Sequence, residues 1–485
     1  MTPSSHTQPA ILFVDGLWVE KFGIMSLIPH LQTAGFKVGW LLTRNNRRLL
    51  REVASFNPDY VAFSVTTGYH LRALAMARLV KQHFPAVKTV FGGPHVTYFP
   101  DFALEPEVDI ALRGECDREF PEALAMLAHG APRETVPNLV FGDQGSALEA
   151  GRRLQASHKA VPDLGPLAPL VEDLDSLPFP DRELLYQRYS FYRKSPYKQF
   201  IVSRGCPYDC AFCFNRKLRC MYEGKGRFVR LRSPESIVAE AVQVKNRWGM
   251  KLASFEDDLL TWDKGWLERL LSLWADQVKV PYNINATARD LTDESVVRLL
   301  KETGAWCVAF GVETGDETLR RKVLNKPVAD AHIVKAGELL NRHGILFHTY
   351  NMFALPEETF EQALKTVRLN RRIQTPLARC TLFQPYPGTE LGDSVAPPNQ
   401  GEMLFSQGKT ATLEAARIQR LQKYAMVAMR SEAGEAIARL ASHVPAGPVH
   451  TAVFWASYFN VVRKYMKTGY RHLLELGVRS MTDWF

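Results

Sequence analysis

The sequence lacks long apolar runs and any compositional extreme. Its 485 residues contain no stretch of about 18 uninterrupted apolar residues, so it predicts no transmembrane helix. Gly (31) and Pro (29) together form about an eighth of the chain, which excludes collagen-like and disordered classes. The chain is globular in composition, with 46% hydrophobic and 23% charged residues. At about 150 residues per domain, its length suggests about three domains.

The excess of basic over acidic residues is also small. The 60 Lys and Arg residues exceed the 51 Asp and Glu residues by a net charge of +9, without a run typical of a nucleic-acid-binding arm. We therefore expect no nucleic-acid partner. The first residues show no basic region followed by an apolar one, so the sequence predicts no signal peptide and a cytoplasmic location.

The chain contains only seven cysteines, which is an odd number. An odd count in a long chain without an export signal argues against a disulfide framework. Four of the seven cysteines fall within fifteen residues, and this crowding needs a chemical explanation. The cysteines are Cys116, Cys206, Cys210, Cys213, Cys220, Cys307 and Cys380.

The first 130 residues alternate apolar runs with amphipathic stretches. Near-continuous apolar strands separated by helices predict a doubly wound parallel sheet, covered on both faces, which binds ligands beyond the carboxyl ends of its strands. Strands are expected at 10–15, 36–42, 59–65, 87–91 and 108–112.

Loops at those carboxyl ends offer hydroxyls and bare backbone amides. Thr66 and Thr67 follow one strand, and Gly92, Gly93 and His95 follow another. Such groups suit a phosphate or ribose. The competing interpretation is structural: a Gly-Gly-Pro sequence is often only a tight turn, and a lone histidine is often an ordinary loop residue.

The cysteine cluster has the spacing Cys206-x3-Cys210-x2-Cys213. Three thiolates on one short loop can bind three irons of a [4Fe–4S] cluster and leave the fourth iron open. A structural zinc site that adds Cys220 is the alternative. It is less favoured, because structural zinc sites typically use two Cys-x2-Cys pairs.

Two motif sets resemble one known family. The segment 58–67, together with 91–95 and 113–115, resembles the cobalamin-binding domain of B12-dependent radical SAM enzymes over residues 10 to about 130. The resemblance implies cobalamin, contacted by Ser64, Thr66, Thr67, Gly92, Gly93 and His95. The first loop, 15–23, lacks the Asp-x-His-x-x-Gly motif whose histidine ligates cobalt in methionine-synthase-type domains.

The segment 203–215, with Phe212 before the third cysteine, resembles the radical SAM signature. The resemblance implies that Cys206, Cys210 and Cys213 bind the cluster. S-Adenosylmethionine then chelates the open iron and is reductively cleaved to a 5′-deoxyadenosyl radical. Matching segments extend from about 196 to 392, including 385–390, and imply an open (β/α)6 barrel whose strand ends carry functional groups. Its strands are expected at 200–203, 252–256, 283–286, 306–311, 347–351 and 380–383.

Several strand ends acquire roles from this resemblance. Glu256, Asp257 and Asp258 follow the second expected strand and would receive the ammonium group of S-adenosylmethionine. Arg289 would pair with its carboxylate, and Glu313 would hydrogen-bond its ribose or methionine part. A solvated acidic turn and a surface ion pair are the competing interpretations for the acidic cluster and for Arg289. In the turn 355–359, Glu357 replaces a family glycine.

The C-terminal region, 393–485, resembles no family known to us. Helices are expected near 411–441 and 450–476. The aromatic-rich stretch 451–465 favours packing against the barrel; a substrate gate and an interfacial membrane helix are the alternatives. The predicted division is a cobalamin-binding domain at 1–130, a linker at 131–195, a radical SAM core at 196–392 and this helical region.

The resemblance implies a cobalamin-dependent radical SAM methyltransferase that acts on an unactivated carbon of a small, hydrophobic substrate. An electron donor such as flavodoxin or ferredoxin would be its partner. A second hypothesis is non-methyl radical chemistry of the anaerobic Mg-protoporphyrin ester cyclase type. A third, from another class, is an interaction protein that holds zinc through the four clustered cysteines.

Overall fold

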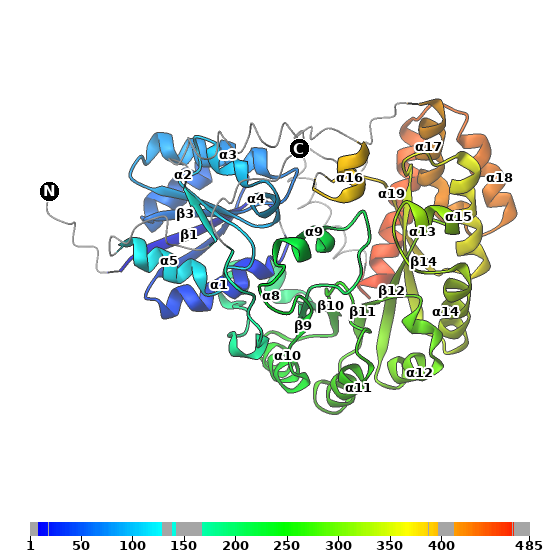
Figure 1. Cartoon of the computed structure of the whole chain (residues 1–485), viewed down its shortest axis with the longest axis horizontal. Coiled ribbons are helices and arrows are strands. Elements are labelled where there is room, and N and C mark those ends of the chain that lie inside the picture. Colours follow the sequence, from blue (N-terminus) through cyan, green and yellow to red (C-terminus); the bar gives the residue numbers. More distant parts are fainter. Residues whose placement is uncertain are drawn as a thin grey trace, which may run out of the picture.

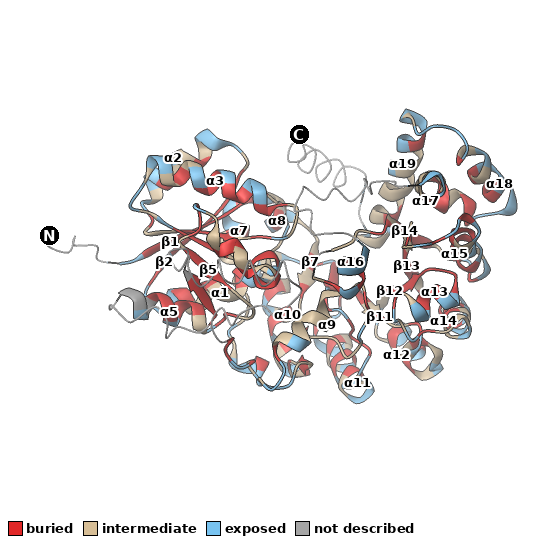
Figure 2. Cartoon of the chain, turned by 45° about the horizontal axis from the view of Figure 1, so that its top comes forward, coloured by how far each residue is buried: buried red, intermediate tan, exposed pale blue. Residues whose placement is uncertain are grey.

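The computed structural model describes residues 8–17, 19–128, 138–141, 167–386, 388–395, 412–467 and 469. Figure 1 shows an N-terminal α/β unit, a second α/β unit, and a group of helices against the far edge of the second unit. Figure 2 shows that strands in both sheets are largely buried, with exposed residues concentrated on the surrounding helices. No helix among the described residues is both long and apolar enough to cross a membrane.

The N-terminal sheet has the strand order β2-β1-β3-β4-β5-β6. Five strands are parallel, and β6 pairs antiparallel with β5. Helices α1 (Phe22–Thr33) and α5 (Glu119–Ala128) pack on one face, while α2 (Asn46–Phe56) and α3 (His70–His83) pack on the other. The strands are β1 (Ala10–Asp15), β2 (Lys37–Leu42), β3 (Tyr60–Ser64), β4 (Lys88–Gly92), β5 (Ile110–Leu112) and β6 (Leu139–Phe141).

The second sheet has six parallel strands in the order β14-β13-β12-β11-β10-β7. Its strands are β7 (Tyr197–Phe200), β10 (Leu252–Phe255), β11 (Tyr282–Ala286), β12 (Ala305–Glu313), β13 (Leu346–Phe353) and β14 (Leu377–Leu382). The intervening helices are α10 (Pro234–Trp248), α11 (Lys264–Leu273), α12 (Glu294–Glu302), α14 (Asp330–Arg342) and α15 (Phe360–Arg372). The predicted fold class, a doubly wound domain followed by a partial barrel and a helical region, is confirmed.

The first barrel strand differs from its predicted range, 200–203. The ladder with β10 ends at Phe200. The Asp257 carboxylate accepts hydrogen bonds from the backbone amides of Val202 and Ser203. Because these amides are already paired, the chain leaves the sheet and forms the short ribbon β8 (Ser203–Arg204) with β9 (Arg230–Leu231).

The N-terminal unit extends beyond the predicted boundary at residue 130. Strand β6 joins its sheet, and helices α7 (Glu183–Arg188) and α8 (Ser190–Lys194) pack against it. Tyr186 and Tyr192 are buried in the same core as α1. Much of the expected connector is therefore part of this domain. Residues 129–137 and 142–166 lie outside the described residues.

The C-terminal region forms α17 (Leu413–Ala428), α18 (Glu432–Ala441) and α19 (Pro448–Tyr465). The single helix expected at 411–441 is two helices, because the Ser431 hydroxyl accepts from the Gly434 amide and caps a new helix. The end of α19 packs on the concave side of the barrel. There, the Tyr465 carbonyl accepts from Asn283 Nδ2 at 3.1 Å, and the Tyr465 ring lies 5.5 Å from the His348 ring.

Candidate active site

The three motif cysteines line one cavity of ≈ 280 Å³ at the carboxyl ends of the barrel strands. This space, the cysteine cavity, is bordered by Cys206, Cys210 and Cys213 on the loop between β8 and α9 (Phe214–Met221). The loop is anchored to the barrel by a hydrogen bond from the Ala211 amide to the Leu324 carbonyl at 2.9 Å. The Cys-x3-Cys-x2-Cys spacing thus lets all three cysteine side chains line the same cavity.

The thiols of this loop are partly buried, and burial shifts their ionisation. It raises the pKa of Cys206 to about 11 and that of Cys210 to about 12, and it also raises the pKa of Cys213. The thiols are therefore neutral at pH 7 until cations compensate the cost of burying thiolates. Iron supplies that compensation, so loading a cluster releases protons.

The geometry favours a cluster over zinc. Cys220 is exposed on α9, and it does not line the cysteine cavity. Across the described ranges, no three His, Cys, Asp or Glu side chains converge tightly enough to hold a single metal ion. In a [4Fe–4S] cluster each thiolate binds its own iron, so the sulfurs need not converge on one point. Three thiols around one cavity fit this arrangement.

The three acidic residues after β10 divide into two groups. Glu256 and Asp258 are exposed to the cysteine cavity, where they accept hydrogen bonds from Tyr197 and Asn215 at 3.0 and 2.9 Å. Asp257 is 3% exposed, and its Oδ1 accepts from the Val202 and Ser203 amides and from the Ser203 hydroxyl. Burial raises the pKa of Asp257 to about 7. Asp257 therefore positions the segment before the cysteine loop through Oδ1. It also lines the cysteine cavity, and its Oδ2 has no hydrogen-bond partner among the described residues, so its predicted contact with S-adenosylmethionine stays a prediction.

Glu313 lies at the end of β12 and lines the cysteine cavity. Its carboxylate is held by Lys326 Nζ at 2.7 Å, and its backbone has φ +61°. Nothing in the local sequence pattern marked Lys326. The turn residue Glu357 has φ +59°, the left-handed conformation that the family glycine would adopt readily.

Arg289 is not among the residues that line the cysteine cavity. Ala288 is buried, and the following 3₁₀ turn, Asp290–Thr292, leaves the Arg289 side chain exposed. The predicted pairing of Arg289 with the carboxylate of S-adenosylmethionine stays a prediction.

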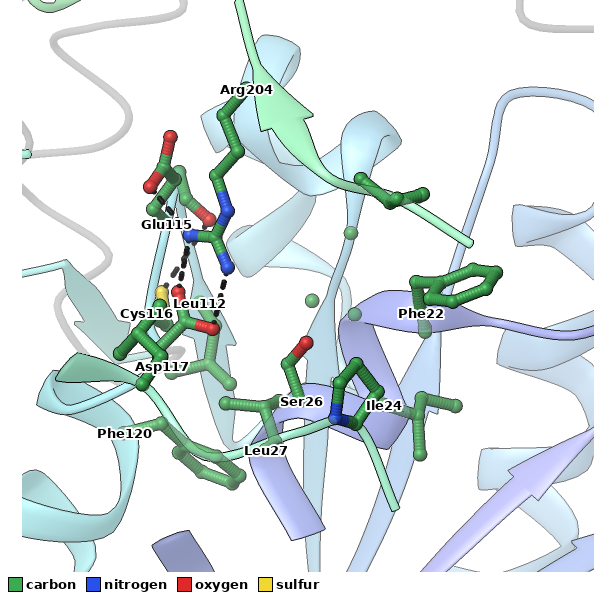
Figure 3. Close-up of a pocket in the computed structure, with 18 of the residues that line it drawn as sticks. Phe22, Ile24, Ser26, Leu27, Leu112, Glu115, Cys116, Asp117, Phe120 and Arg204 are labelled. Atoms are coloured by element: carbon green, nitrogen blue, oxygen red, sulfur yellow. Dashed lines mark hydrogen bonds and ion pairs between the residues drawn. The ribbon is translucent and has the colours of Figure 1, made fainter. Parts of the chain in front are cut away.

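A larger cavity of ≈ 360 Å³ lies between the N-terminal domain and the barrel. We call it the interdomain cavity. Figure 3 shows apolar side chains along one part of its wall and the ion-paired group of Arg204, Glu115 and Asp117 along another. Its apolar lining includes Phe22, Leu27, Leu112 and Phe120.

The residues expected to contact cobalamin separate into two sets. Ser64, Gly92 and Gly93 line the interdomain cavity, but Thr66, Thr67 and His95 do not. The lining places two glycines beside apolar side chains, and these features fit the flat, apolar benzimidazole ring in the tail of cobalamin.

His95 instead turns into the domain interior. It is 3% exposed, it hydrogen-bonds Thr67 Oγ1 through Nδ1 at 3.0 Å, and its ring stacks on His70 at 3.9 Å. Burial lowers the pKa of His95 to about 3. Gly93, at φ +95°, turns the chain so that the His95 amide donates to the Val65 carbonyl. The His95 and Thr67 side chains therefore bind each other within the domain, and their predicted contact with cobalamin stays a prediction.

The first loop of the N-terminal domain carries an ion pair in place of a histidine. Lys21 Nζ lies 2.7 Å from the buried Asp15 carboxylate and donates to the Ser64 carbonyl at 2.5 Å. The described residues that line the interdomain cavity include no histidine. This agrees with the absence of the cobalt-ligating motif from the sequence.

The expected connector supplies a wall of the interdomain cavity that we did not predict. Leu174, Leu177, Pro178 and Pro180 line it opposite the sheet, together with the barrel residues 201–204. The apolar Leu and Pro residues of this segment could have indicated a cavity wall, but we interpreted the segment only as an extended connector. The cavity is thus built from both domains.

Comparison with known proteins agrees with this geometry. Residues 200–369 match the radical SAM superfamily, and residues 10–124 match the B12 binding domain. The chain carries a B12 binding domain and a radical SAM domain. The two domains make it an enzyme and imply a [4Fe–4S] cluster, S-adenosylmethionine and cobalamin, as predicted.

Relatives include an uncharacterized methyltransferase of Pyrococcus horikoshii, 27% identical over 70% of this chain and 70% of that protein. The cytidylyl-2-hydroxyethylphosphonate methyltransferase of Streptomyces wedmorensis is 25% identical over 64% of this chain. The anaerobic magnesium-protoporphyrin IX monomethyl ester cyclase of Rubrivivax gelatinosus is 26% identical over 71% of it. The match spans 60% of the length of each of these last two proteins.

Among solved structures, the radical S-adenosylmethionine methyltransferase TsrM from Kitasatospora setae has a similar fold. The TM-score is 0.63 at 16% sequence identity, and the match covers 80% of this chain and 76% of TsrM. This similarity supports the arrangement of the two domains and the partial barrel.

Proposed function

We propose that this radical SAM enzyme transfers a methyl group to an unactivated carbon of a small substrate. The observation that carries the proposal is the meeting of two cavities at one short segment. Residues 201–204 line the interdomain cavity, and Cys206, two positions later, lines the cysteine cavity. A cofactor in the first would thus lie next to the cluster and S-adenosylmethionine bound at the second.

When bound, the cluster supplies the electron that cleaves S-adenosylmethionine, and cobalamin supplies the methyl group. The chain binds and orients these groups. Cys206, Cys210 and Cys213 would hold the cluster. Glu256 and Asp258 would face the ammonium group of S-adenosylmethionine.

Two further contacts of the chain complete the proposed binding sites. Glu313, held by Lys326, would accept a hydrogen bond from a ribose hydroxyl. The backbone at Ser64, Gly92 and Gly93 would border cobalamin.

The two domains are joined by aromatic contacts next to the cysteine loop. Tyr98 of the N-terminal domain stacks on Phe214 at 4.4 Å, and Phe214 contacts Tyr386 at 5.6 Å. These rings fix the cysteine loop between the two domains. They support a role for the N-terminal domain in the reaction at the cluster.

The test uses S-adenosylmethionine with a deuterated methyl group and the anaerobically reconstituted holoenzyme. Methyl transfer predicts that the label is recovered with cobalamin and, on addition of candidate apolar substrates, in a methylated product. S-Adenosylhomocysteine and 5′-deoxyadenosine should accompany it. Formation of 5′-deoxyadenosine with no label in either cobalamin or product would overturn the proposal.

The relatives named as ester cyclases favour one alternative, oxidative cyclisation with oxygen derived from water. Isotope tracing separates the two functions. Methyl transfer predicts product label from the methyl group of S-adenosylmethionine, whereas cyclisation predicts product label from H₂¹⁸O.

We also infer an electron donor such as flavodoxin or ferredoxin and a cytoplasmic location. All seven cysteines are free thiols, and free thiols are typical of proteins in a reducing compartment. Pull-down of the reduced holoenzyme with purified flavodoxin, followed by measurement of electron transfer, tests the partner.

A further inference from the structure

A third cavity of ≈ 250 Å³ opens beside the cysteine cavity. We call it the β13–β14 cavity, because the ends of these two strands and the segment after them build it. Phe212, Glu313 and Tyr350 line both cavities, so the two cavities adjoin each other. A molecule in the β13–β14 cavity would therefore lie within reach of the site proposed for S-adenosylmethionine.

The guanidinium of one arginine lines this cavity. Arg379 lies on β14 opposite Tyr350 of β13, and its side chain is exposed to the cavity. Within the described part of the chain, no carboxylate lies within 4 Å of Arg379. Glu313, the one carboxylate among the described residues of the lining, is already paired with Lys326 at 2.7 Å. The cavity therefore carries a net positive charge on one wall.

A second donor in the same cavity also lacks an acceptor. Gln384 follows β14, and its Nε2 atom is buried without a hydrogen-bond partner. A buried N–H that stays unpaired costs free energy comparable to a lost hydrogen bond. The Gln384 amide and the Arg379 guanidinium can both donate hydrogen bonds to oxygen atoms of a ligand. A negatively charged ligand would supply acceptors for both groups.

The rest of the lining is mainly apolar. Phe212, Met352, Leu382, Phe383 and Tyr386 provide aromatic and aliphatic surface around the two donors. Such a cavity accepts a carbon skeleton with one charged end. A purely hydrophobic substrate would leave the Arg379 charge and the Gln384 amide without partners.

We propose that the β13–β14 cavity binds the substrate, and that the substrate is a small amphipathic anion. Arg379 and Gln384 bind its carboxylate or phosphoryl oxygens, and its apolar carbons lie among the aromatic side chains near the cysteine cavity. This assignment rests on the proposed function for the identity of the bound molecule as the substrate, but the anion site itself does not depend on it.

The test measures binding of simple probes to the reconstituted holoenzyme by isothermal titration calorimetry. Benzoate and phenylphosphonate represent the two anion sources, and benzyl alcohol is the neutral probe. We expect at least one of the two anions to bind more tightly than benzyl alcohol. The preferred anion identifies the head group as carboxylate or phosphoryl.

Arg379→Gln should weaken binding of that anion at least tenfold and leave benzyl alcohol binding unchanged. Arg379→Lys should restore part of the loss, and Gln384→Leu should cost a few-fold. Arg372→Gln, on the exposed outer side of α15, is the matched control and should bind as the wild type does. The proposal is overturned if neither anion binds better than benzyl alcohol, or if Arg379→Gln binds the anions as tightly as the wild type.

Failure of the proposed function is detected separately. The same holoenzyme is incubated with S-adenosylmethionine and a reductant, and 5′-deoxyadenosine is measured. Absence of cleavage together with Arg379-dependent anion binding would refute the radical chemistry while leaving the anion site intact. Cleavage without Arg379-dependent binding would refute the anion site alone.

Discussion

Glu358 shows how the barrel tolerates a buried acid outside the reaction centre. Its Oε2 accepts from the Leu355 amide at 3.2 Å, and its Oε1 is buried without a partner. Burial raises the pKa of Glu358 to about 8 from an ordinary value of 4.5. The folded protein therefore favours the protonated carboxyl. The stability that this proton confers is complete below pH 4.5 and is lost as the pH rises through 8.

Replacing Glu358 by Gln should remove this pH dependence. The free energy of unfolding of the wild type, relative to Glu358→Gln, should fall between about pH 5 and 8 by up to about 1.4 kcal/mol per pH unit. Denaturant titrations at several pH values measure it. Glu357→Gln, at the exposed neighbouring position, is the control. A difference between wild type and Glu358→Gln that does not change with pH would contradict this account.

The cysteines allow a second test at the residue scale. Cys206→Ala, Cys210→Ala and Cys213→Ala should each lose most of the iron bound after anaerobic reconstitution, since each removes the only thiolate for one iron. Cys220→Ala should retain wild-type iron, because Cys220 is exposed and outside the cavity. Iron and sulfide analysis measures both outcomes. Equal iron loss in Cys220→Ala would mean that the cluster uses another ligand set.

At the scale of elements, Asp257 sets the course of the chain between β7 and the cysteine loop. One carboxylate oxygen accepts three hydrogen bonds from Val202 and Ser203. These bonds end the first barrel strand and direct the chain into β8. The path of the cysteine loop thus depends on a residue more than fifty positions later in the sequence.

Asp257→Ala should therefore lower the free energy of unfolding by about 2 kcal/mol or more, because it leaves buried amides unpaired. It should also reduce iron retention. Asp257→Asn keeps an acceptor oxygen and should largely restore both properties. Denaturant unfolding and iron analysis are the measurements, with the exposed Asp276→Ala as the control. Wild-type iron retention in Asp257→Ala would show that the loop does not need this anchor.

The elements that sequence reasoning predicted well are those set by local pattern. The apolar runs gave five strands of the first sheet and six of the second, since burial on both faces needs continuous apolar residues. The elements it missed depend on distant contacts. Strand β6 forms only by pairing with β5, and the break at Ser431 divides a stretch with uniform helical character.

The candidate site was predictable to a similar extent. The cysteine spacing identified the three cavity thiols, and Glu313 was found from a short motif. The burial of His95 was not predicted, because sequence does not show which way a loop turns after Gly93. Lys326 and Arg379 carried no local signal, because their importance comes from what faces them across the barrel.

At the scale of the whole molecule, an ion-pair cluster joins the two domains at the interdomain cavity. Arg204 of the barrel contacts Asp117 and Glu115 of the N-terminal domain at 2.7 Å, and Arg230 also contacts Glu115. Arg204 binds Asp117 through two nitrogens. Such bidentate, partly buried pairs contribute more than exposed ones.

Asp117→Asn should weaken this contact. We expect the free energy of unfolding to fall by about 1–3 kcal/mol, and amide hydrogen exchange to increase in β8 and β9. Glu122→Gln, exposed on α5, should change neither property. Unchanged exchange in β8 and β9 would show that the ion pairs do not hold the domains together.

The most direct test of the account is reductive cleavage of S-adenosylmethionine by the anaerobically reconstituted protein. The wild type should form 5′-deoxyadenosine when a reductant is present, and each of Cys206→Ala, Cys210→Ala and Cys213→Ala should lose this activity. If any of the three variants formed 5′-deoxyadenosine at the wild-type rate, the assignment of the cysteine cavity to a cluster with an open iron would be contradicted.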